Sequence, residues 1–79
     1  MTRTASYDSL PNARRVATAR SALNAAMWAR GDNPDICPEA VIDLLVDLRH
    51  LSVARHIDFT ACNAAAETHF ETEISGGQR

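Results

Sequence analysis

The chain has 79 residues and a formal net charge of −2, with eight arginines and no lysine. This length predicts a single domain over residues 1–79, near the size at which one core gives little stability and oligomerisation or a partner contributes. Cys37 and Cys62 stand 25 positions apart, without the paired spacing of a zinc site or a disulfide framework. No apolar run is long enough to span a membrane, and the N-terminus lacks a signal-peptide core, so we expect a cytoplasmic protein with reduced thiols.

The first predicted element is a helix over residues 10–30, after an arm at residues 1–8. Asp8 or Ser9 can cap this helix, Pro11 suits its first turn, and Gly31 is a good residue to end it. Its apolar stripe consists mostly of alanine, which buries little area but lets another helix approach closely.

Trp28 lies off that stripe. At about 100° per residue it shares a face with Leu10, Ala17 and Ser21. Two interpretations compete: the N-terminal arm covers Trp28, for example with Tyr7, or Trp28 is an exposed anchor for a partner, since tryptophan is enriched in binding hot spots.

Two further helices, over about 38–55 and 59–73, form a helical hairpin. Pro38 opens the first of them, and its apolar residues cover two adjoining stripes, so it contacts neighbours on two sides or forms a dimer seam. Asp58 is placed to cap the last helix, and Ile57 to pack on a buried Cys62. Residues 75–79 read as a loose tail. The pattern predicts an all-α, three-helix domain whose core contains Leu44, Leu45, Leu48, Leu51, Phe59 and Phe70.

Charge is unevenly distributed along the chain. Residues 1–30 carry five arginines and one aspartate, whereas residues 31–79 carry nine acidic residues and three arginines. In one interpretation the basic first helix docks on the acidic hairpin within the fold; in the other the two patches serve partners. The arginines of the first helix point in different directions around it, which is a poor track for phosphates, so direct nucleic-acid binding is disfavoured.

No group of residues has both the types and the spacing that catalysis requires. Asp43, Asp47 and His50 share one helix face and could hold a divalent metal, but the signal is weak and the pattern favours a solvated strip in which Asp47 pairs with His50. Cys62 and His69 lie two turns apart on one helix, too far for a nucleophile and its base. We therefore predict a protein that is not an enzyme, with no catalytic residues, metal ligands or cofactor.

Residues 43–73 resemble a family of short, mostly uncharacterised all-α proteins encoded on phages, plasmids and other bacterial mobile elements. The chain departs from that pattern at His56, where a glycine or asparagine is expected, and in its N-terminal helix. The residues that carry the resemblance are Asp43-Leu44-Leu45, Asp47-Leu48, His50, Asp58-Phe59, Ala66, His69-Phe70 and Glu73.

The resemblance implies an accessory protein acting in the cytoplasm of a bacterial host. By analogy with anti-CRISPR proteins, we expect it to bind and inhibit or remodel a host protein complex, such as a CRISPR effector. The alternative is a small DNA-binding or antitoxin-type regulator that uses the arginine-rich first helix. A homodimer is compatible with either function. The predicted partner-binding residues are Trp28, Arg14, Arg15, Arg20 and Arg30.

Overall fold

A computed structural model describes residues 10–75 and contains three helices in this range. They are α2 (Leu10–Arg30), α3 (Pro38–Ala54) and α4 (Phe59–Ser75), and no strand occurs among the described residues. The prediction of an all-α domain with a central hairpin is confirmed. The observed helix bounds agree with the predicted ones to within one residue, except at the C-terminal end of α4. There the helix continues to Ser75, whose hydroxyl donates to the Glu71 carbonyl at 2.7 Å. The predicted arm, the caps Asp8 and Ser9, and tail residues 76–79 lie outside the described range.

Helix α2 ends where the sequence predicts, at Gly31. The glycine has φ 88°, and its N–H donates to the Trp28 carbonyl at 3.1 Å. The next N–H, of Asp32, donates to the Met27 carbonyl at 2.9 Å. This pair of bonds is a Schellman motif, which requires a left-handed residue and therefore favours glycine.

Helix α3 ends in the same motif, but with His56 in the left-handed position. The N–H of Ile57 donates to the Ser52 carbonyl at 2.8 Å, and the N–H of His56 donates to the Val53 carbonyl at 3.3 Å. His56 has φ 59°, a conformation that costs an L-residue roughly 1–2 kcal/mol. His56 thus occupies a position at which the backbone conformation favours glycine.

Asp58 caps α4 as predicted. Its carboxylate Oδ1 accepts a hydrogen bond from the Ala61 N–H at 3.0 Å, which satisfies one of the free donors of the first turn. The prediction that Cys62 is buried under Ile57 is wrong, because Cys62 is exposed and Ile57 is 49% exposed. The capping bond therefore holds this turn without a covered hydrophobic pair beneath it.

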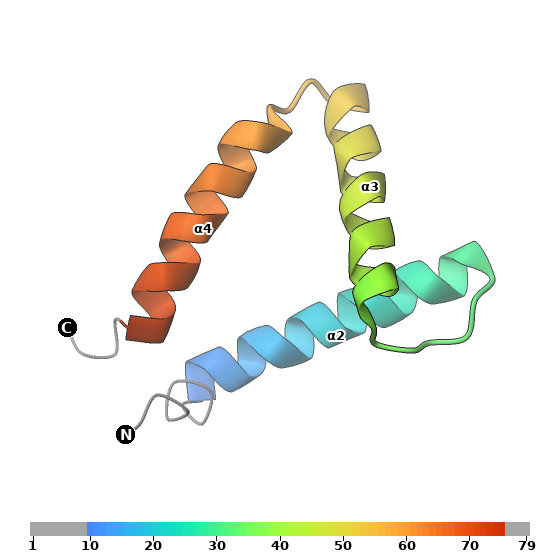
Figure 1. The fold of residues 1–79 in the computed structure, drawn as a ribbon, viewed down its shortest axis with the longest axis horizontal. Helices are drawn as coiled ribbons and strands as arrows, with labels where there is room; N and C mark the ends of the chain where they lie inside the picture. Colours follow the sequence, from blue (N-terminus) through green and yellow to red (C-terminus); the bar gives the residue numbers. More distant parts are fainter. Residues whose placement is uncertain (1–9, 76–79) are drawn as a thin grey trace.

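The three helices enclose an open triangle (Figure 1). Helix α3 crosses the C-terminal half of α2 and then diverges from it, and α4 returns toward the N-terminal end of α2. The contact between α2 and α4 is at their ends, where the side-chain amide of Asn12 donates to the Glu73 carbonyl at 3.3 Å. The Cα radius of gyration is 14.6 Å, against about 11.6 Å for a compact domain of this length.

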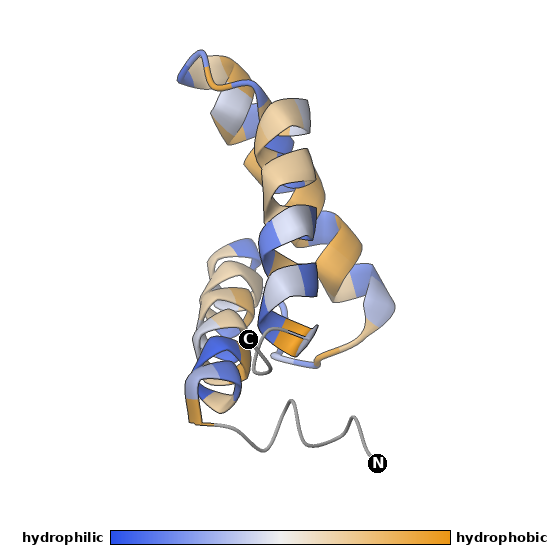
Figure 2. Ribbon diagram, turned by 90° about the vertical axis from the view of Figure 1, so that its left-hand side faces the viewer, coloured by the Kyte–Doolittle hydropathy of each residue, from blue (hydrophilic) through white to orange (hydrophobic). Residues whose placement is uncertain are grey.

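The buried core is small and lies where α2 and α3 cross. Its buried apolar residues are Leu23, Met27 and Ala40, with Cys37 and Leu44 packed against them. Orange, hydrophobic segments occur along the helices in Figure 2 rather than in one enclosed interior.

The predicted core is wrong for four of its six residues, since the helices diverge too soon to cover them. Leu44 and Phe59 are half-buried. The four that stay exposed are Leu45 (42%), Leu48 (39%), Leu51 (56%) and Phe70 (50%).

Candidate partner-binding surface

The outer strip of α2, defined by Leu10, Arg14, Ala17, Ser21 and Trp28, faces away from the other helices. The side of α2 that contacts α3 carries Leu23, Met27 and Arg30. At about 100° per residue, the outer strip lies on the opposite side of the helix from Arg30. All five of its residues are exposed.

Trp28 is the largest apolar side chain on this strip, and it is 64% exposed. Tyr7, its alternative cover, lies outside the described residues. Arg14 is about 21 Å from Trp28 along the helix axis, at 1.5 Å per residue. The residues between them on this face, Ala17 and Ser21, are small, so a partner helix could approach the backbone closely between two larger anchors.

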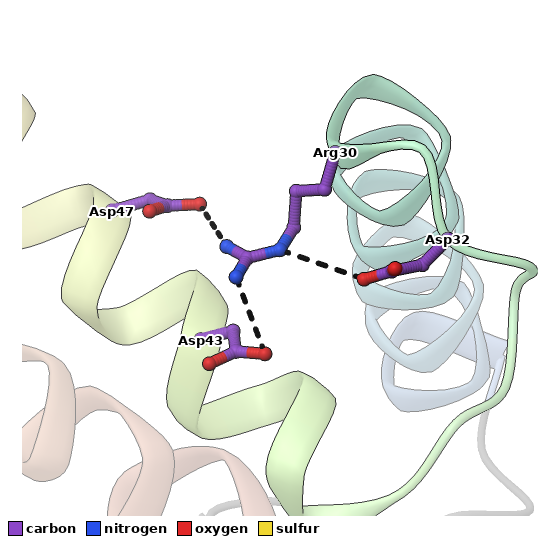
Figure 3. Close-up of polar contacts among 4 residues, drawn as sticks. All are labelled: Arg30, Asp32, Asp43 and Asp47. Atoms are coloured by element: carbon purple, nitrogen blue, oxygen red, sulfur yellow. Dashed lines mark hydrogen bonds and ion pairs between the residues drawn. The ribbon is translucent and has the colours of Figure 1, made fainter.

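Arg30 lies on the inner side of α2 and contacts three carboxylates of the same chain (Figure 3). Its Nη1 donates to Asp47 Oδ2 at 2.9 Å, while Nη2 lies 3.4 Å from Asp43 Oδ2 and Nε lies 3.7 Å from Asp32 Oδ2. Asp43 and Asp47 are one turn apart on α3, so the guanidinium bridges two helices. Because these side chains are between 36% and 63% exposed, solvent screens the network strongly.

Arg15 is paired at the other end of α2. Its Nη2 lies 3.0 Å from Glu73 Oε2 on α4, next to the bond from Asn12 to the Glu73 backbone. Together, Arg15 and Arg30 support the interpretation that the basic first helix docks on the acidic hairpin. Both belong to the predicted binding set, but both already neutralise carboxylates within the chain.

Arg14 and Arg20 are exposed, and neither forms an ion pair with another described residue. Arg14 lies on the outer strip, whereas Arg20 is about 120° away around the helix, on the flank that faces the triangle. The structure thus leaves two of the four predicted arginines available to a partner, and they lie on different faces.

The two aspartates considered above as metal ligands form ion pairs instead. Asp43 and Asp47 are turned to Arg30, and the described residues contain no cluster of three or more potential metal ligands. The two free cysteines are separate, since Cys37 precedes α3 as its N-cap residue and Cys62 lies near the start of α4. No helix in the described region has the length and apolarity to cross a membrane.

A second exposed surface, which sequence reasoning missed, lies inside the triangle. We call it the apolar wedge and define it by Ile42 and Leu45 on α3 and Ala66 and Phe70 on α4. At the hinge, α3 turns Arg49 and Ser52 toward α4: Arg49 lies 4.5 Å from the centre of the Phe59 ring, and Ser52 is buried. Leu45 and Ile42 continue that face of α3, as Ala66 and Phe70 continue the Phe59 face of α4.

Phe70 also lines a shallow hollow with Arg15, His69 and Glu73, so this side of α4 faces α2. Periodicity placed these apolar residues on one face, but it carries no information on the angle between two helices. The angle between two helices decides whether one covers the apolar face of the other. Here that angle leaves Phe70 half-exposed.

No protein-family model, curated protein or solved structure matches this chain.

Proposed function

We propose that the protein works by stoichiometric binding to another protein, through the outer strip of α2. The observation that carries this proposal is the exposure of Trp28, 64%, on the side of α2 opposite the intramolecular ion pairs of Arg30. Transfer of an exposed tryptophan from water into a partner's pocket is favourable, because it buries a large apolar surface. Such residues dominate the binding energy of interfaces. An adjacent stripe of small residues suits a helix, packed as in other helix–helix contacts.

The partner we propose is a host protein complex, with the protein acting as a mobile-element inhibitor of the anti-CRISPR kind. This more specific proposal rests on the resemblance of residues 43–73 to mobile-element proteins. A DNA-binding role through the same helix is less well supported, because Arg15 and Arg30 are paired with carboxylates and Arg14 and Arg20 lie on different faces.

The test is capture of partners from a bacterial host lysate with the wild type, Trp28→Ala and Val53→Ala as baits. Val53 is 77% exposed on α3, so its truncation is a matched control for loss of an exposed apolar side chain. Trp28→Ala should weaken binding of the captured complex by about 30-fold or more, while Val53→Ala leaves it unchanged. Equal binding by all three, or tight binding of duplex DNA with a steep salt dependence, would contradict the proposal.

A further inference from the structure

The total accessible surface is large for a chain of this size. The accessible surface is 6204 Å², whereas a compact monomer of 8.6 kDa exposes about 4,700 Å². The excess is about 1,500 Å² by that scaling.

The large apolar side chains of the wedge are part of this exposed surface. In the wedge, Ile42 is 56% exposed, Leu45 42% and Phe70 50%. Val16, which is 42% exposed, follows the side of α2 that carries Leu23, so it extends this surface toward α2. Several large apolar side chains exposed on the facing sides of two helices indicate an interaction site.

We propose that a second copy of this chain closes the apolar wedge, giving a two-fold symmetric dimer. Three buried apolar side chains among residues 10–75 are too few to hold three helices together, so we expect the covering partner to be present whenever the chain folds. A second copy meets that condition, and two-fold dimers are the commonest closed assembly.

Charge complementarity supports a second copy in particular. Arg20 on the inner flank of α2 forms no ion pair with a described residue, and neither do Glu67 and Glu71 on α4. When a two-fold axis brings α4 of one copy beside α2 of the other, these opposite charges meet twice in one interface. An isologous contact needs this self-complementarity, which is a basic patch and an acidic patch flanking the same apolar surface.

The first measurement is the mass of the full-length wild type by size exclusion with light scattering, over a wide concentration range. We expect twice the chain mass of 8.6 kDa, and a melting temperature that rises with protein concentration. A single-chain mass at all concentrations would overturn the proposal and leave the wedge to a different partner.

The second measurement locates the interface with two substitutions on α3. Leu45→Glu places a charge in the wedge, whereas Leu51→Glu, on an exposed leucine of the same helix (56%), points about 120° away. Leu45→Glu should dissociate the dimer and Leu51→Glu should retain it. If Leu45→Glu loses its helices, Phe70→Ala replaces it, with a dissociation constant raised by about 10-fold or more. A dimer insensitive to both wedge variants would overturn the assignment.

Discussion

Leu23→Ala tests whether the crossing of α2 and α3 is the folding core. Leu23 is 6% exposed and packs with Met27, Ala40 and the half-buried Leu44. The substitution removes three carbon atoms from an almost fully buried position, which at about 0.8 kcal/mol per methylene gives about 2.4 kcal/mol. The cavity term should be small because this cluster borders open surface and can relax, so the loss falls in the lower half of the roughly 2–5 kcal/mol range for such changes.

Leu51→Ala is the matched control. Leu51 is the same residue type on α3, but it is 56% exposed and lies outside the apolar wedge. Less than half of its transfer free energy is at stake, so we expect a loss of about 1 kcal/mol or less. Leu48→Ala, at 39% exposed, should fall between the two.

The assay is thermal and urea unfolding followed by far-ultraviolet circular dichroism, at one fixed protein concentration because assembly contributes to stability. For a domain of this size, Leu23→Ala should lower the melting temperature by about 10–20 °C. Equal losses for Leu23→Ala and Leu51→Ala would refute the placement of the core at this crossing.

Three further predictions concern polar and backbone features, each measured in the same unfolding assay. Arg30→Ala should lower the free energy of unfolding by about 1 kcal/mol at low salt and by much less in about 1 M salt, because it removes a screened ion-pair bridge between α2 and α3. Arg14→Ala should have no effect, and a salt-independent loss for Arg30→Ala would contradict the ion-pair explanation. Asp58→Ala should cost about 1 kcal/mol through the lost bond to Ala61, and Asp58→Asn should retain most of it; equal losses would exclude capping as the cause. His56→Gly should stabilise by about 0.5–1 kcal/mol, since relief of left-handed strain exceeds the added freedom of the unfolded chain; a destabilised variant would show that the imidazole forms a contact of greater value.

Features that depend on short stretches of chain could be predicted from the sequence. The helices begin and end within two residues of the predicted positions, because Gly31, Pro38 and Asp58 act through their own backbone or the adjacent turn. The ion-pair partner of a charged residue could be predicted only by the sign of its charge. Arg30 meets Asp47, which is 17 positions away, because of the particular crossing of two helices.

Burial could not be predicted in the same way. The periodicity of Leu45, Leu48 and Leu51 places them on one broad apolar side of α3, but periodicity does not say what covers that side. Within a single chain, α4 diverges from α3 beyond the Phe59 contact and leaves all three exposed. A pattern that normally indicates a core here indicates exposed surface, and we propose that assembly covers the part of it around Leu45.

The two proposed surfaces belong to different sides of α2, and this separation has a physical origin. The inner side is used by the small core, by the ion pairs of Arg15 and Arg30, and by the flank of the wedge. Trp28, on the outer strip, can contribute to none of these contacts, so its exposure is not relieved by closing the wedge. Dimerisation through the wedge would leave two copies of the outer strip exposed. Loss of binding by Trp28→Ala with an unchanged dimer mass is therefore the result that assigns recognition and assembly to separate faces.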